Sequence, residues 1–292
     1  MGEGENLLKS MKGFVQKAGK VGRRLPVSSQ LGTKLNLLLT LVRRDLEAQY
    51  KGSILGNLWP LLNQLSQLLI YTYVFSIVLK VKLTLQGFPD NSNITFGLWL
   101  FAGLLPWTAF TSGLTKAAVS VMSQPNLVKK VVFPLGLLPL VPIFSVFIES
   151  SLGLIALIGI VAVSSQKLHA TLWLLPFIWL PQLLLTAGFG YLTAGLTVFL
   201  RDIPQSLGVI LNLWFYLTPI VYPATVIPEE WRVWIFSLNP LAAIAEVYRD
   251  LILVGEVKHW TEWGAVSVIS IIVFYLGLFV YRRLRPAFAD VL

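Results

Sequence analysis

The chain has 292 residues, of which 55% are hydrophobic and only 13% charged, and its mean hydropathy is +0.73. Soluble globular domains carry about 25% charged residues, and disordered chains hold far fewer apolar residues than this one, so an integral membrane protein is the expected class. The absence of cysteine excludes disulfide scaffolds, thiolate metal sites and cysteine nucleophiles.

The first predicted element is an amphipathic helix. Residues 1–33 hold scattered lysine and glycine without a long apolar run, and we expect them to form a cytoplasmic tail. Residues 35–50 then repeat leucine and valine at helical spacing, while the opposite face carries Arg43, Arg44 and Glu47. This pattern is typical of a helix lying at the membrane interface. It leaves open whether the helix only anchors the chain or also docks a cytoplasmic partner.

Six runs with few or no charges follow, and each is long enough to cross a bilayer, for which about 20 apolar residues suffice. An even number of crossings places both ends of the domain formed by residues 34–292 on one side. With these ends inside, seventeen of the 23 lysines and arginines fall on inner segments, as cytoplasmic loops require. The predicted spans are residues 54–79, 94–115, 139–163, 170–200, 203–222 and 263–281.

The segment between the fifth and sixth predicted spans has a different character. It begins with prolines and charges, and a charge-free run of thirteen residues broken by Asn239 and Pro240 follows. Thirteen residues cannot span a bilayer, and such a run is typical of a re-entrant or interfacial segment. The sequence therefore predicts an all-α integral membrane protein with six transmembrane helices, an N-terminal amphipathic interface helix and a re-entrant outer hairpin.

Glu149 is the one ionisable residue deep inside a predicted span. A charge there costs at least a few kcal/mol against lipid, so its side chain should face the interior of the bundle. No lysine or arginine is expected at the same depth in another span, which favours a structural polar contact over a role in transport. The only histidines, His169 and His259, have no partner at a ligand spacing, and we expect no metal site and no acid–base role for them.

The ten tryptophans, Trp107 among them, lie mostly at predicted membrane ends, as interface belts do. Phe215, Tyr216 and Tyr222 differ, because they lie on the fifth predicted span and lead into the outer hairpin. Aromatic faces can stack on sugar rings without reading one fixed sequence, by the logic that lets them stack on bases. The interface interpretation of these three residues stays open.

The chain lacks the glycine-rich phosphate cradle that ATPases use, and its acidic residues are mostly single. Lipid-phosphate transferases typically need clustered aspartate or histidine, so catalysis by this chain is disfavoured. If ATP supplies the energy, another polypeptide hydrolyses it. The net charge of +9 is largely explained by orientation, and we expect contacts with membrane lipids but no nucleic-acid partner.

From residue 34 to the end, the order of motifs resembles the membrane subunits of ABC transporters that export polysaccharides and teichoic acids. Each motif is short, and the resemblance lies in their number and order. They are VRRD at 42–45 with LG at 55–56 and WP at 59–60; FAGLLPW at 101–107 with NLVKK at 126–130; TPIVYP at 218–223 with NPL at 239–241; and FADVL at 288–292.

This resemblance implies a homodimer in the bacterial inner membrane, paired with two copies of a cytoplasmic ATPase that binds ATP and Mg²⁺, and a lipid-linked polysaccharide such as O-antigen, capsule or teichoic acid as substrate. It implies ATPase coupling through the interface helix and the loop at 124–130, with Arg43, Arg44, Asp45, Glu47, Gln124, Asn126, Lys129 and Lys130. It implies an outer gate with Glu229, Trp231, Arg232, Asn239 and Pro240. It also implies a channel lined by Tyr71, Phe215, Tyr216 and Tyr222 of the first and fifth spans, with Trp107 of the second span as a further channel residue. The alternatives are an ABC exporter of drugs or lipids and a membrane-embedded glycan or phospholipid transferase.

Overall fold

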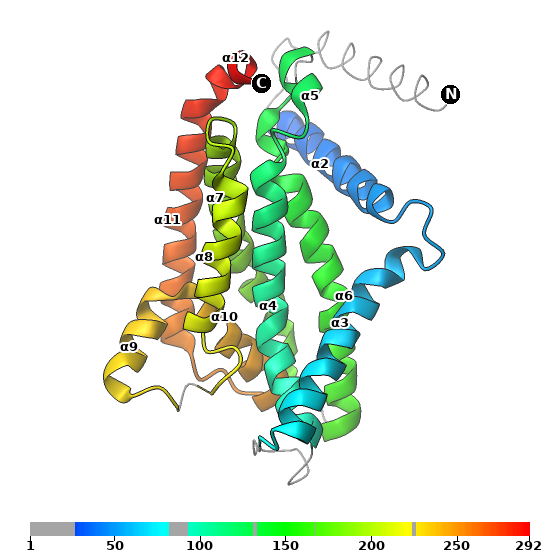
Figure 1. The fold of residues 1–292 in the computed structure, drawn as a ribbon, viewed down its shortest axis with the longest axis vertical. Coiled ribbons are helices and arrows are strands. Elements are labelled where there is room, and N and C mark those ends of the chain that lie inside the picture. Colours follow the sequence, from blue (N-terminus) through cyan, green and yellow to red (C-terminus); the bar gives the residue numbers. More distant parts are fainter. Residues whose placement is uncertain (1–26, 82–92, 131–132, 167, 224–225) are drawn as a thin grey trace.

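The computed structural model describes residues 27–81, 93–130, 133–166, 168–223 and 226–292, and every regular element in these ranges is a helix (Figure 1). The predicted tail at residues 1–33 lies mostly outside them. Long helices run side by side in Figure 1, with α2, α5 and the C-terminus gathered at one end of the bundle and α9 and α10 at the other. We refer to the first of these ends as the terminal end.

Five helical stretches are long and apolar enough to cross a membrane. They match the first four and the sixth of the predicted spans, and their lengths run from 20 to 32 residues. Their elements are α3 (Trp59–Tyr71) with η2 (Thr72–Val78), α4 (Asn93–Val119), η3 (Leu135–Leu137) with α6 (Leu140–Ser165), η4 (Ala170–Leu174) with α7 (Leu175–Thr197), and α11 (Trp260–Leu284) with η7 (Arg285–Ala287) and α12 (Phe288–Val291).

The fifth predicted span is shorter than expected. It contains α8 (Ile203–Leu217), which ends where Thr218 adopts an extended backbone. Fifteen helical residues rise about 22 Å, less than the roughly 30 Å hydrocarbon core of a bilayer. The proline that follows, Pro219, cannot continue the helical hydrogen bonding.

The remaining helices are short or lie beside the bundle: α2 (Val27–Gln49), η1 (Gly56–Leu58), α5 (Pro125–Lys130), α9 (Glu229–Leu238), α10 (Pro240–Arg249) and η6 (Asp250–Val254). The segment predicted as a loop at residues 124–130 is thus mostly the helix α5. On α2, Leu38 and Val42 are buried, whereas Leu35 and Leu39 are exposed. The apolar face predicted for residues 35–50 is therefore only partly turned toward the bundle.

Helix α4 lies at the centre of the fold. In its most apolar window 83% of the residues are buried, against 11% for the stretch formed by α3 and η2. Beside it, α7 and α11 approach each other at Gly188 and Gly277, where an added Cβ on Gly277 would overlap the carbonyl of Gly188. Such close approach of small residues is a common basis of helix packing in membranes.

A chain of buried hydrogen bonds connects α10, α7 and α4. The hydroxyl of Tyr248 donates to Oε1 of Gln182 over 2.7 Å, and Nε2 of Gln182 donates to the carbonyl of Pro106 over 3.0 Å. Pro106 lies inside α4, where a proline disturbs the helical hydrogen-bond ladder. The proline removes the donor to the carbonyl of Ala102, one turn earlier, whereas Gln182 adds a side-chain donor to the carbonyl of Pro106 itself at a place with little access to water.

Arg249, at the end of α10, is 2% exposed. Its guanidinium lies 3.5 Å from the ring centre of Trp99 and donates to the carbonyls of Trp99 (3.2 Å), Pro219 (3.0 Å) and Ile220 (2.9 Å). It also forms an ion pair with Glu246 over 2.7 Å. The side chain of Arg249 thus bonds α4 and the end of α8 to α10 inside the protein.

Replacing Arg249 by methionine should lower the free energy of unfolding by about 3–5 kcal/mol, because it leaves Glu246 and three buried carbonyls without their donor. Thermal unfolding of the purified protein in detergent measures the effect, with Arg283→Met on the exposed end of α11 as the control. Equal melting temperatures for Arg249→Met and Arg283→Met would contradict this account.

Gly103→Ala should also destabilise the protein, since its Cβ would lie 2.6 Å from Nη2 of Arg249.

Candidate functional site

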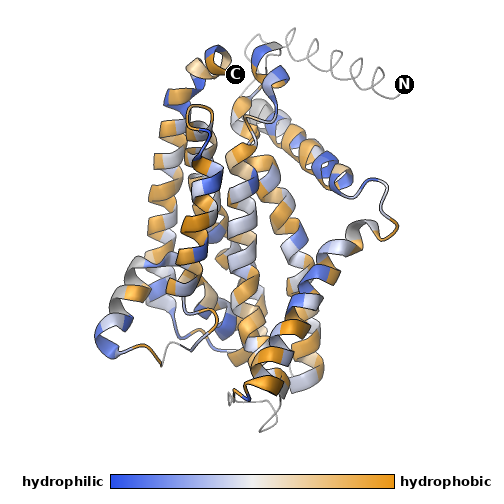
Figure 2. Ribbon diagram, in the orientation of Figure 1, coloured by the Kyte–Doolittle hydropathy of each residue, from blue (hydrophilic) through white to orange (hydrophobic). Residues whose placement is uncertain are grey.

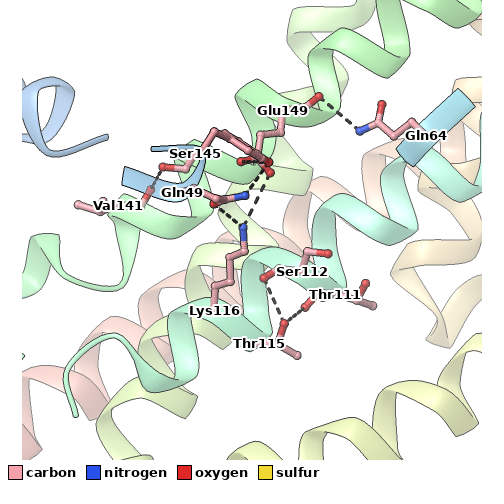
Figure 3. A network of polar contacts seen from close by, with 10 residues as sticks. Gln49, Gln64, Thr111, Ser112, Thr115, Lys116, Val141, Ser145 and Glu149 are labelled. Carbon is pink, nitrogen blue, oxygen red and sulfur yellow. Dashed lines mark hydrogen bonds and ion pairs between the residues drawn. The ribbon is translucent and has the colours of Figure 1, made fainter. Parts of the chain in front are cut away.

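Glu149 of α6 is the centre of a polar network between three helices (Figure 3). Its carboxylate lies 3.8 Å from Nζ of Lys116 on α4 and accepts a hydrogen bond of 3.3 Å from the hydroxyl of Tyr50. Lys116 also donates to Oε1 of Gln49 over 3.0 Å, and Gln49 donates to the Tyr50 hydroxyl over 2.7 Å. The network therefore connects the C-terminal end of α2 with α4 and α6.

The expectation that Glu149 has no basic residue at its depth is wrong. Helix α4 continues to Val119, beyond the predicted end of the second span at residue 115, and thus carries Lys116 as a helical residue facing α6. Ser145, one turn before Glu149, donates to the carbonyl of Val141 over 3.1 Å (Figure 3). The structural contact predicted for Glu149 is present, and it includes a charge pair.

The contacts around Glu149 are long for hydrogen bonds, so each is individually weak. Gln64 of α3 donates to the backbone carbonyl of Glu149 over 3.4 Å, which brings a fourth helix to the same place. Burial and the neighbouring carboxylate raise the pKa of Tyr50 above its usual value of 10.0, so its hydroxyl remains a donor. Several weak contacts at one point can exchange during a movement of α2 without leaving a charge unpaired.

An aromatic cluster lies between α4, α7 and α8. Trp107 contacts Phe215 with ring centres 5.5 Å apart and Trp214 at 6.3 Å, and Phe110 contacts Trp214 at 5.5 Å and Phe189 at 6.0 Å. Trp107 is 8% exposed, so its assignment to a membrane-interface belt is corrected: it packs inside the protein. The cluster forms a rigid apolar body on the side of α4 that faces α8.

The residues predicted to line a channel fall into separate places. Trp107 and Phe215 belong to the aromatic cluster, and the ring of Tyr216 lies 5.4 Å from that of Phe215 but is 64% exposed. The hydroxyl of Tyr222 donates to the backbone carbonyl of Tyr216 over 3.0 Å. Tyr71 instead contacts Phe75 at 6.3 Å. Tyr216 is therefore the one of these five whose ring is mostly open to its surroundings.

The predicted coupling residues lie on two helices at the terminal end. On α2, Arg43 and Glu47 form an exposed ion pair of 2.8 Å, Arg44 is exposed, and Asp45 is half-buried. Around α5, the side chains of Gln124, Asn126 and Lys129 are exposed, and that of Lys130 lies outside the described side chains. In Figure 1, α5 stands near the beginning of α2. Both helices thus present polar surface at the same end of the bundle.

The predicted gate residues lie on the opposite end. Glu229 and Trp231 are exposed at the start of α9, and Arg232 donates to the carbonyl of Ile227 over 3.0 Å. Between α9 and α10, Asn239 is buried. Its side chain accepts from Leu241 N (3.2 Å) and from the Trp214 indole (3.0 Å), and it donates to the Thr218 hydroxyl (2.8 Å), while Pro240 is the first residue of α10. Asn239 therefore fixes the junction of the two short helices against α8.

Asp250 and His259 connect the hairpin to the start of α11. Oδ2 of Asp250 accepts from the backbone N–H of Lys258 (2.7 Å) and of His259 (3.1 Å) and lies 2.8 Å from Nδ1 of His259. The imidazole also stacks on Phe236 of α9, with ring centres 6.4 Å apart. These contacts could not be predicted from the sequence, since Asp250 and His259 are nine positions apart. Among the described residues no group of three acidic or histidine side chains could hold a metal ion.

The Glu149–Lys116 contact should be measurable as a coupling between two substitutions. Because Lys116 is partly exposed, Glu149→Gln and Lys116→Met should show a coupling free energy of only about 0.5 kcal/mol in a double-mutant cycle. Unfolding in mixed detergent micelles measures it. The pair Glu149→Gln and Lys129→Met is the control and should be additive, and additivity of the first pair as well would argue against the contact.

The pair of His259 and Asp250 predicts a pH dependence. The hydrogen bond to Asp250, together with the charges of Asp250, Glu246 and Glu262, raises the pKa of His259 above 6.5 although burial opposes this. The stabilisation is complete below the unfolded-state pKa and is lost as pH rises through the higher folded-state value. The melting temperature should therefore fall as pH rises above about 6.5, the unperturbed value for histidine, and less so in His259→Asn. His169→Asn, the control, should keep the fall.

Comparison with known proteins fits this arrangement of helices. Residues 36–253 match the family described as "ABC-2 type transporter". The chain is 30% identical over 268 residues to an "O-antigen export system permease protein RfbA" of Klebsiella pneumoniae, covering 90% of this chain and 97% of that protein. A protein of the same description from Myxococcus xanthus is 29% identical over 257 residues (87% and 94%). The "Polysialic acid transport protein KpsM" of Escherichia coli is 22% identical over 253 residues (84% and 92%). The chain is a multi-pass membrane protein and belongs to the ABC-2 type transporter family.

Proposed function

We propose that the chain is the channel-forming subunit of an ATP-driven exporter that moves a lipid-linked polysaccharide out across the bacterial inner membrane. The relatives that match it over nearly their whole length are named as O-antigen export permeases. The chain carries no phosphate-binding cradle, so ATP and Mg²⁺ bind to a separate ATPase subunit. Two copies of the chain and two copies of that ATPase form the complex.

The observation that carries this proposal is polar surface on helices that cross the membrane. On α3 the exposed side chains include Asn63, Ser66 and Gln67, and on α8 they include Asn212 and Tyr216. Lipid offers no hydrogen-bond partners to such groups, so a hydrated path between two copies is their favourable environment. A sugar chain offers hydroxyls to the amides and ring faces to Tyr216, and these weak contacts suit a polymer that must keep moving.

The topology that fits this path has six crossings, with α8 and the segment after it as a short fifth crossing. Both ends of the domain then lie in the cytoplasm, where α5 and the exposed face of α2 dock on the ATPase. The hairpin of α9 and α10 is re-entrant at the outer surface. ATP-dependent movement of α2 reaches α4 and α6 through the contacts of Glu149, which biases two arrangements of the dimer.

Deleting the chain should remove the polysaccharide from the cell surface and cause its lipid-linked form to accumulate inside. Restoring the chain with Tyr216→Ala should return less surface polysaccharide than the unaltered chain, because a stacking surface is lost, whereas Tyr216→Phe should restore export. Immunoblots of surface and intracellular polymer measure both. Tyr275→Ala, an exposed ring on α11, is the control.

Two results would contradict the proposal. Failure to synthesise any polymer after deletion would indicate an enzyme. Unchanged surface polymer after deletion would exclude this chain from export. Full export with Tyr216→Ala would refute only the proposed stacking of sugar rings on Tyr216.

A further inference from the structure

Helix α4 carries a polar strip that the sequence did not reveal. Between Trp107 and Ala118 only five side chains are not buried, and all five are polar; the others in this interval are buried. The five lie on one side of the helix in its half nearer the terminal end, which is pale in Figure 2, whereas the other half is mostly orange. We define the α4 strip as Thr108, Thr111, Ser112, Thr115 and Lys116.

Helix surfaces elsewhere in the bundle show what a lipid-facing side looks like in this protein. The exposed positions along the middle of α11 are apolar, among them Ile271, Ile272 and Phe279. Helix α4 is the most buried of the five long stretches, so only a few of its positions meet the surroundings. Between Trp107 and Ala118 the few positions of α4 that are not buried are all polar, which indicates contact with water or a polar ligand instead of hydrocarbon.

The hydroxyl groups of the strip are oriented by the helix itself. Thr108 donates to the carbonyl of Leu105 (3.1 Å), Thr111 to that of Trp107 (3.1 Å), and Thr115 to that of Thr111 (2.8 Å). The hydroxyl protons of these three threonines are thereby used, and each oxygen retains a lone pair that can accept from an outside donor. A row of such acceptors favours ligands that are rich in hydroxyl donors.

The two ends of the strip meet features already described. Thr108 adjoins Trp107 of the aromatic cluster, and Lys116 belongs to the network around Glu149. Eight residues of helix separate these ends, which is about 12 Å along α4. The strip therefore runs from the weak contacts near α2 to the aromatic rings on α8 without an interruption by an exposed apolar residue.

We propose that the α4 strip lines the water-filled inner half of the translocation path and accepts hydrogen bonds from the hydroxyl groups of the passing sugar chain. Trp107 is the residue of α4 that the sequence predicted to line the channel, and the strip extends this lining along α4 toward the terminal end. The ligand, a polyhydroxyl polymer, rests on the proposed function. Contact of the strip with water does not rest on that function, because it is argued from the polarity of the five side chains and from their exposure, which is high at Thr115 and partial at the other four.

The absence of native cysteine allows a direct test in the assembled transporter. Single substitutions Thr111→Cys and Ser112→Cys are compared with Ile272→Cys in membrane vesicles, using a charged, membrane-impermeant methanethiosulfonate applied to both sides. A thiol in contact with water ionises, and a thiol in lipid does not, so the two strip positions should react at least about tenfold faster. Rates are measured with and without ATP. Rates equal to that of Ile272→Cys under both conditions would overturn the proposal.

A second experiment separates the sugar contact from the water contact. The triple variant Thr108→Val, Thr111→Val and Thr115→Val removes acceptors while keeping the side-chain shape, and surface polysaccharide should fall several-fold. The matched control replaces Thr186, Thr193 and Thr197 by valine, since these threonines of α7 bond their own helix in the same way but are buried.

The outcomes of the two experiments are distinguishable. Fast labelling with unchanged export in the triple variant would overturn the sugar contact and retain the water-facing strip. Unchanged surface polymer after deletion of the whole chain would refute the proposed function, and the labelling result would then stand on its own. Equal losses in the triple variant and in the α7 control would show a general packing effect and overturn the assigned ligand.

Discussion

The end of the fold around α8 and α10 depends on one constraint: the backbone carbonyls at the break after α8 need hydrogen-bond donors. Where the chain leaves α8, Thr218 is extended and the carbonyls of Pro219 and Ile220 lose helical partners. The guanidinium of Arg249 supplies donors to both carbonyls and to that of Trp99 on α4. One buried side chain thereby permits an irregular segment at a depth where water is scarce, which is a requirement that the membrane imposes on every broken helix.

This constraint divides the molecule into parts of different stiffness. Near α10, short contacts predominate: the Tyr248–Gln182 hydrogen bond at 2.7 Å is buried, and the Arg249–Glu246 pair at 2.7 Å is largely buried. Near α2, the contacts of Glu149 are 3.3 to 3.8 Å long and partly open to solvent. The part with short contacts surrounds α9 and α10, and the part with long contacts lies beside α2, where we propose that the ATPase docks.

The sequence predicted the helices well because hydrocarbon imposes a simple length and polarity rule. Five of the six predicted runs are long apolar helices, and the error at α8 arose because hydropathy continues through Pro219 although the helix does not. Glu149 was correctly expected to have a structural contact, but its partner was missed because Lys116 lies beyond the predicted end of α4. Arg249 was missed for another reason: a single arginine in a charged stretch looks solvated until its distant carbonyl partners are known. The strip on α4 was equally hidden, because exposure depends on which neighbours cover a helix.

The close approach of α7 and α11 has a consequence for how the bundle can widen. At Gly188 and Gly277 the two backbones are in contact, and no side chain lies between them that could change rotamer. This pair can tilt as a unit but can hardly slide or separate. In the proposed exporter, widening for a sugar chain would therefore involve α3, whose stretch with η2 is only 11% buried, while α7 and α11 would keep their spacing.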